Sequence, residues 1–197
     1  MPSRRTHRRH GRAEPGDAER DLGPEADPES VARTIVLTKL TAQARSRAEL
    51  EEVLASRGVP DDVATRVLDR FTEVGLVDDA AYAETWVRSR LQSRGLSRRA
   101  LGQELRRKGV DAEVIQESLE TIDAVAEEAA ARELVARKLR SMSRLDEATQ
   151  LRRLAGMLGR KGYAPGLAYR VAREAVHGSG RSRDAADVGW DASDVDN

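Results

Sequence analysis

A pattern of apolar, basic and glycine residues recurs three times along this chain of 197 residues. Its first copy consists of Leu50, Leu54, Arg57, Gly58, Val59 and Val63. The second copy is Leu101, Leu105, Lys108, Gly109, Val110 and Val114, and the third is Leu154, Leu158, Lys161, Gly162, Tyr163 and Leu167. The glycines lie 51 and then 53 residues apart, and such a period is typical of stacked supersecondary units. The repeat therefore restricts the fold to a row of similar modules.

Each copy predicts a helix, a tight turn and a second helix. Ser46 and Glu49 form a capping-box pattern, the leucines lie one helical turn apart, and Gly58 is the residue type that ends helices. Applied along the chain, these signals predict helices over 29–43, 46–57, 60–74, 78–91, 97–108, 111–123, 147–160 and 165–176, with an alanine-rich helix that ends near Ser141. The predicted fold class is all-α: tandem three-helix repeats that form an elongated, curved array with disordered termini.

Composition divides the chain into five segments. We expect a disordered charged tail over 1–29, a leading helix plus the first three-helix repeat over 30–95, a second repeat over 96–144, a third, truncated repeat over 145–176, and a disordered acidic tail over 177–197. Both tails are rich in charge, Gly, Pro and Ser, and they lack the apolar periodicity that is needed to offset chain entropy.

Several classes of protein are disfavoured. The chain has no cysteine, so disulfides and Cys-ligated metal sites are excluded. It contains neither an apolar run long enough to span a membrane nor a secretory signal. His7, His10 and His177 fall in tails or at a helix end, and no catalytic constellation or phosphate-binding glycine loop is found. We therefore expect no enzyme activity, no cofactor and no metal.

The charges sum to zero but alternate in sign along the chain. Residues 49–84 hold ten acids and three arginines, whereas 88–108 hold eight basic residues and one acid. Residues 111–133 hold eight acids and one arginine, whereas 137–173 hold ten basic residues and two acids. Either these charges pair within the molecule on solvated faces, or they match a partner that carries both signs, such as a nucleoprotein.

Two local features allow a structural and a functional interpretation. Asp78 and Asp79 are an acidic pair, but aspartate at a helix start is most often a cap. Tyr82 and Trp86 lie one helical turn apart. They would suit a platform on which bases stack, but the pattern favours core packing.

The segment Gly75-Leu-Val-Asp-Asp-Ala-Ala-Tyr-Ala-Glu-Thr-Trp-Val-Arg-Ser-Arg90 closely resembles the characteristic stretch of the RecX regulatory proteins. Arg94-Gly95, the run from Leu101 to Val110, the opening Ser46-Arg47-x-x-Glu-Leu50 and the closing Leu154-x-x-x-Leu158-x-x-Lys161-Gly162-Tyr163 are also similar to that family. The resemblance covers about 33–176. It implies a bacterial cytoplasmic modulator of the RecA recombinase that lies in the groove of the RecA–DNA filament. It also implies suppression of ATP hydrolysis, strand exchange and co-protease action, and thereby a role in recombination, DNA repair and the SOS response.

The resemblance and the charge pattern together nominate site residues. The expected filament-binding residues are Arg88, Arg90, Arg94, Arg98, Arg99, Arg106, Arg107 and Lys108, followed by Arg152, Arg153, Arg160 and Lys161. Helical spacing cannot place the first eight on one face, so some of them are bystanders. Asp78, Asp79, Tyr82, Ala83, Trp86 and Gly109 match positions that we interpret as mainly structural: the two aspartates as cap and the aromatics as packing between units.

The leading hypothesis is a non-enzymatic RecA inhibitor that binds the RecA filament and the DNA within it irrespective of sequence, as a monomer and away from membranes. One alternative is a general DNA-binding helical repeat without recombinase contact, although its acidic segments would repel phosphate. The other is a metal-dependent enzyme that uses carboxylates such as Asp78 and Asp79.

Overall fold

The computed structural model describes residues 27–187, with side chains described through residue 179. Within this range the chain is entirely helical. The helices are α1 (Pro28–Ala42), α2 (Arg47–Ser56), α3 (Asp61–Glu73), α4 (Asp79–Arg94), α5 (Arg98–Arg107), α6 (Ala112–Glu120), α7 (Ala124–Leu139), the short 3-10 helix η1 (Arg140–Met142), α8 (Glu147–Arg160) and α9 (Pro165–Asp187). The predicted all-α fold is confirmed.

Most helices begin at a side chain that satisfies their free backbone amides. The oxygen of the N-cap residue accepts a hydrogen bond from an amide of the first turn at Asp27, Ser46, Asp78, Ser97, Asp111, Asp123 and Asp146. Such caps each stabilise a helix by about 1 kcal/mol. The predicted capping box of Ser46 and Glu49 is present with both of its hydrogen bonds.

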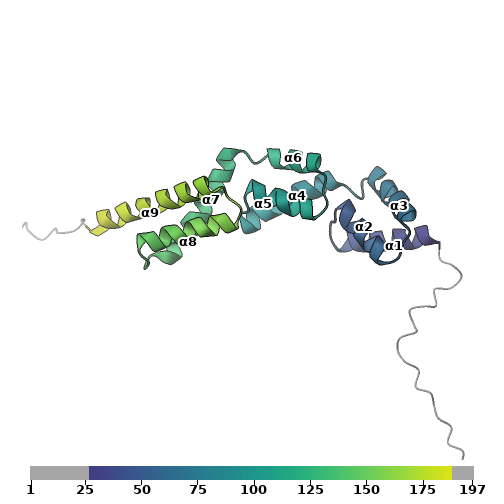
Figure 1. Cartoon of the computed structure of the whole chain (residues 1–197), viewed down its shortest axis with the longest axis horizontal. Helices are drawn as coiled ribbons and strands as arrows, with labels where there is room; N and C mark the ends of the chain where they lie inside the picture. The colour runs from purple at the N-terminus through teal and green to yellow at the C-terminus, as the bar shows by residue number, and fades with distance from the viewer. Residues whose placement is uncertain (1–26, 188–197) are drawn as a thin grey trace, which may run out of the picture.

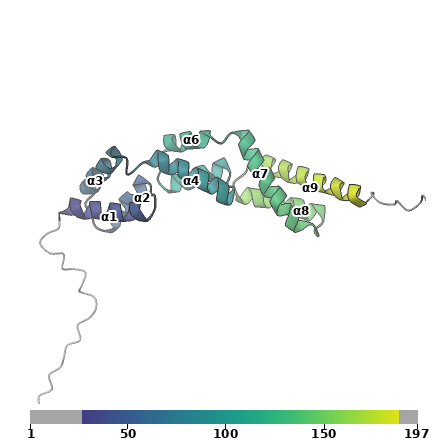
Figure 2. The same cartoon turned by 180° about the vertical axis from the view of Figure 1, so that it is seen from behind.

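The helices pack as three successive three-helix units, each with its own core. The first unit is α1–α3, the second α4–α6 and the third α7–α9. The repeated leucines lie at the centre of each core: Leu50 and Leu54, Leu101 and Leu105, and Leu154 and Leu158 have no exposed surface. The units follow one another in a gently arched row (Figures 1 and 2).

This grouping is shifted by one helix from the grouping expected from the sequence. The expected boundaries after residues 95 and 144 assign α4 to the first repeat and α7 to the second, whereas α4 packs on α6 and α7 packs on α9. Consequently α1 is a full member of the first unit, and α7 completes the third unit that we expected to be truncated. A repeated motif locates two helices of each unit, but it does not reveal whether the helix before or after them covers their apolar faces.

The end of α9 also differs from the expectation. We expected a disordered tail from residue 177, but the helix continues to Asp187. Extending a helix that tertiary packing has already nucleated adds one backbone hydrogen bond per residue, so a polar continuation needs no apolar face. The first helix likewise begins at Pro28, inside the expected N-terminal tail. Residues 1–26 and 188–197 of the two tails lie outside the described residues.

Candidate functional site

The first and second units meet where the start of α2 contacts the end of α5. The Ser46 hydroxyl donates a hydrogen bond of 2.6 Å to the Lys108 carbonyl, and the Arg47 amide donates one of 2.8 Å to Asp79 Oδ1. A Cβ atom added to Gly109 would lie 2.3 Å from the Cβ of Ala48. We call this contact the first joint; it consists of Ser46, Arg47, Ala48, Glu49, Asp79, Tyr82, Lys108 and Gly109.

The second and third units meet through equivalent residues. The Ser97 amide donates to the Lys161 carbonyl at 3.0 Å, and the Arg98 amide donates to Glu127 Oε1 at 3.0 Å. A Cβ on Gly162 would lie 2.5 Å from Ser97 Oγ. This contact therefore repeats the design of the first joint: a capped helix start in one unit rests on the lysine–glycine turn of the next. We call it the second joint; it consists of Arg94, Gly95, Ser97, Arg98, Arg99, Ala100, Glu127, Lys161, Gly162 and Tyr163.

A partly buried ion pair neutralises the lysine of the first joint. Lys108 Nζ lies 2.6 Å from Glu49 Oε1, and the Tyr82 hydroxyl donates to Glu49 Oε2 at 3.3 Å. Burial opposes ionisation of Glu49, but hydrogen bonds from Lys108, the Ser46 amide and Tyr82 outweigh it and lower the pKa of Glu49. Burial likewise opposes the charge of Lys108, but Glu49 and Tyr82 raise its pKa. Both groups are thus held in their charged forms.

Trp86 lies beside this joint between two cations. The Arg90 guanidinium is 4.0 Å from the centre of the Trp86 ring system and Lys108 Nζ is 4.4 Å from it, which is cation–π geometry. The indole nitrogen donates to Glu104 Oε2 at 3.0 Å, and Glu104 also pairs with Arg90 at 3.5 Å. Trp86 is half-buried, whereas its neighbour Tyr82 is buried. The ring faces occupied by these cations are not a free stacking platform.

The signature positions take part in a helix cap, the core and the first joint, and one of them differs from the prediction. Asp78 caps α4, as predicted, by accepting from the Ala81 amide at 2.9 Å. Asp79 is not a cap: its carboxylate accepts from the Arg47 amide of the first unit, and burial raises its pKa against the effect of that hydrogen bond. Ala83 is fully buried in the core of the second unit. No role was predicted for Glu104, which contacts three residues of α4: Trp86, 18 residues earlier, and also Arg90 and Arg94.

The predicted filament-binding residues divide into a paired and an unpaired group. Arg90 and Arg94 lie 3.5 Å and 3.8 Å from Glu104, and Lys108 pairs with Glu49. The other nine form no ion pair with a carboxylate in residues 27–179. They are Arg88 on α4; Arg98, Arg99, Arg106 and Arg107 on α5; Arg152, Arg153 and Arg160 on α8; and Lys161 after α8.

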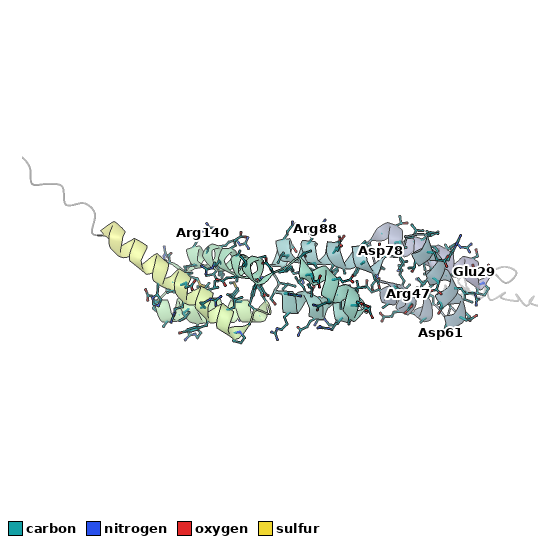
Figure 3. All side chains as sticks on the ribbon, turned by 90° about the horizontal axis from the view of Figure 1, so that it is seen from above. Glu29, Arg47, Asp61, Asp78, Arg88 and Arg140 are labelled. Carbon is teal, nitrogen blue, oxygen red and sulfur yellow. The ribbon has the colours of Figure 1, made fainter. Side chains whose placement is uncertain are left out.

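Arg88 of the second unit and Arg140 of the third unit lie on the same side of the row (Figure 3). Figure 3 shows Arg88 and Arg140 along the same long edge of the molecule, with Asp61 at the opposite edge. Arg140 lines a hollow with Lys138, Arg144 and Arg153, and none of the residues that line this hollow is acidic. We call these four residues the cationic hollow. Only Arg153 of the four is among the predicted filament-binding residues, although all four belong to the basic run over 137–173.

Neither a metal-holding cluster nor a membrane-spanning helix is found in the part of the chain that the structure describes. Within 27–187, no cluster of His, Asp and Glu side chains is arranged to hold a metal ion. No helix in that range combines the length and apolarity needed to cross a bilayer.

Comparison with known proteins assigns the same three units. Models of the first, second and third three-helix domains of RecX match residues 32–71, 78–119 and 126–172. The regulatory protein RecX of Streptomyces coelicolor is 50% identical over 169 residues, which cover 86% of this chain and 87% of that protein. The regulatory protein RecX of Thermobifida fusca is 47% identical over 161 residues, covering 80% of this chain and 87% of its own.

A solved structure shares the fold. The crystal structure of RecX from Lactobacillus salivarius superimposes with a TM-score of 0.68 at 20% sequence identity, covering 76% of this chain and 97% of that one. Three domain matches in order, relatives at half identity over most of their length and a common arrangement of units all agree. The chain belongs to the RecX family of regulatory proteins.

Proposed function

We propose that this protein is a non-enzymatic negative regulator of the RecA recombinase in the bacterial cytoplasm. It binds as a monomer along the groove of the RecA–DNA filament and lowers ATP hydrolysis, strand exchange and co-protease activity. Family membership supports a regulatory role. The elongated row of units supports binding along a filament rather than enclosure of a small substrate.

The observation that carries the proposal is the set of nine predicted contact residues that form no ion pair among residues 27–179. A protein whose carboxylates neutralised these residues would have no need of a partner's charge, but within that range the arginines of α5 and α8 have no carboxylate partner. Phosphate groups of filament DNA supply the matching charge irrespective of sequence. The acidic residues of α3 and α6 then face protein, because they would repel bare DNA.

The test adds purified protein to RecA on single-stranded DNA and measures ATP hydrolysis and strand exchange. The proposal expects both rates to fall as the protein approaches the RecA concentration. Unchanged rates at stoichiometric amounts would refute it. Tight binding to bare DNA at physiological salt with unaltered filament activity would instead establish the general DNA-binding alternative. Electron microscopy of filaments with and without the protein shows whether it lies in the groove.

Charge-reversed variants identify the contact surface. Arg106→Glu with Arg107→Glu changes two exposed, unpaired residues of α5, and Arg140→Glu with Arg144→Glu changes the cationic hollow. Arg57→Glu with Arg70→Glu is the matched control in the first unit, because both residues are exposed and the Arg70–Glu73 pair is too solvated to matter. We expect weaker filament binding only for the first two variants. Their log–log salt dependence should flatten by roughly 0.7–0.9 per lost phosphate contact.

A further inference from the structure

The two joints share a design but differ in charge at one position. Ser46 and Ser97 are equivalent helix caps, so Glu49 and Ala100 occupy the same third position of α2 and α5. In the first joint Glu49 neutralises Lys108. In the second joint alanine takes that position, and the equivalent lysine, Lys161, forms no ion pair with a carboxylate among residues 27–179.

Two other cations, Arg94 and Arg137, lie close enough to Lys161 to interact with its charge. Its ammonium group donates a hydrogen bond to the Arg94 carbonyl. Burial lowers its pKa, and the charges of Arg137 and Arg94 lower it further. Arg99, also in the joint, donates from Nε to the Gly162 carbonyl at 3.1 Å. The second joint therefore collects positive charge that nothing described within it offsets fully.

A cavity of about 430 Å³ opens at this joint. Arg98, Arg99 and Arg106 of α5 line it together with Gln116 of α6, and the third unit contributes Glu127, Gly162 and Ala164. Glu127 is already engaged, because its carboxylate accepts from the Arg98 amide. The side chains of Arg98 and Arg106 form no ion pair among residues 27–179.

We propose that this cavity is a phosphate-binding site whose ligand bridges the second and third units. Guanidinium groups bind phosphate oxygens in pairs of charge-assisted hydrogen bonds, and the Gln116 amide adds a neutral donor. The amides at the start of α5 are not required, since Ser97 Oγ and Glu127 already accept from them. A phosphate bound there adds negative charge beside Arg98, Arg99 and Arg106, in a joint that has alanine where the first joint has Glu49.

The phosphate has two sources: the free ion or the backbone of DNA. The inference deepens the proposed function only if DNA is the source, and it stands alone if the free ion binds. The experiment therefore contains no recombinase, so that failure of this site and failure of RecA regulation remain distinguishable.

Binding is measured by backbone amide NMR of the full chain. Inorganic phosphate in one arm and a short single-stranded oligothymidylate in the other are titrated against chloride at matched ionic strength. We expect saturable shifts at Gln116, Gly162 and Ala164. Arg98→Ala with Arg106→Ala should lower the binding affinity obtained from these shifts about tenfold or more. Arg57→Ala with Arg70→Ala should leave that affinity within about twofold of the wild-type value.

Shifts with phosphate assign the site to the free ion, and shifts with the oligonucleotide alone assign it to a DNA phosphodiester; either result supports the site. Shifts that chloride reproduces or that survive Arg98→Ala with Arg106→Ala would overturn the site, and so would the absence of shifts in both arms.

The bridging of the two units is measured separately, and the absence of cysteine from the sequence allows spin labels to be placed at chosen positions. Spin labels at Gln103→Cys and Ala148→Cys report the distance across the second joint, and labels at Glu52→Cys and Gln103→Cys report the distance across the first joint. The bound ligand should narrow the distribution of distances across the second joint only. Equal narrowing at both joints, or none at either, would refute bridging.

Discussion

Gly109 lies directly against Ala48 of the preceding unit, so closely that a Cβ on the glycine would come within 2.3 Å of the Cβ of Ala48. Its φ of 70° is one that other residues rarely adopt. Two requirements for glycine therefore coincide at this residue. The turn after α5 requires a positive φ, and the neighbouring unit leaves no room for a Cβ atom.

Replacing Gly109 by alanine separates these requirements from one another. Gly58 has the same backbone conformation, with a φ of 72°, but an added Cβ there meets no described atom within 4 Å. Gly58→Ala should cost about 1 kcal/mol, from the backbone alone. Gly109→Ala should cost a further 1–3 kcal/mol or so, because the units must move apart. Urea unfolding followed by Trp86 fluorescence in a Trp190→Phe background measures the difference; equal costs would mean that the joint yields without resistance.

The two cap serines should differ in the same way. Ser97 Oγ accepts from the Ala100 amide, whereas Ser46 Oγ accepts from the Glu49 amide and also donates to the Lys108 carbonyl. Ser97→Ala should therefore cost about 1 kcal/mol, the value of a cap. Ser46→Ala should cost about 2–3 kcal/mol, since it also leaves a carbonyl of the joint without its donor. The same unfolding assay compares them, and a larger cost at Ser97 would contradict our assignment.

Acid should weaken the first joint through Glu49. Because its pKa is lowered by folding, Glu49 stabilises the protein above its ordinary pKa of 4.5, and this contribution is lost as the pH falls through the lowered value. Glu49→Gln should cost about 1–3 kcal/mol at neutral pH and should flatten the decline of stability in acid. Asp62→Asn is the control: the Arg66 hydrogen bond also lowers the pKa of Asp62, but that pair is fully exposed and its loss should not be measurable.

Trp86 should stabilise the fold through the hydrogen bond of its indole nitrogen as well as through the burial of its ring. Trp86→Phe keeps a ring between Arg90 and Lys108 but removes the hydrogen bond to Glu104, and it should cost about 1 kcal/mol. Trp86→Ala should cost about 2–4 kcal/mol, less than for a fully buried tryptophan. Far-UV circular dichroism follows the unfolding of both variants. Wild-type stability combined with lost filament binding would make Trp86 a contact residue instead.

The individual helices were predictable because their signals are local. Capping residues such as Ser46 and Asp78 stand immediately before the helices that they start, and the spacing of Leu50 and Leu54 identifies the buried face. The grouping into units was not predictable in this way. Whether α4 covers α3 or α6 depends on competing packing surfaces that lie tens of residues apart, and the repeat itself is equally compatible with both.

The basic charge of the candidate site was predictable from the sequence, but the ion pairs that its residues form were not. The basic segments were evident from counting, yet the count does not show that Lys108 pairs with Glu49, 59 residues earlier, whereas Lys161 pairs with no carboxylate in the part of the chain that the structure describes. A lysine before a glycine has the same local sequence signal in both repeats. Only the residue at the third position of the preceding unit's helix, glutamate or alanine, distinguishes them, and that residue becomes informative once the joint is known.

Using one joint twice gives the row of units a polarity. Within the described residues, no unit precedes the turn at Gly58, and none follows the start of α8, where Asp146 stands in place of the serines at 46 and 97. Contacts between copies through these two surfaces would be head-to-tail, so they would build open filaments unless the rotation between copies closed a ring. An ionised Asp146 can only accept hydrogen bonds, whereas the Ser46 hydroxyl donates to the Lys108 carbonyl. A unit added at that end would therefore lack the hydroxyl-to-carbonyl hydrogen bond of the first joint.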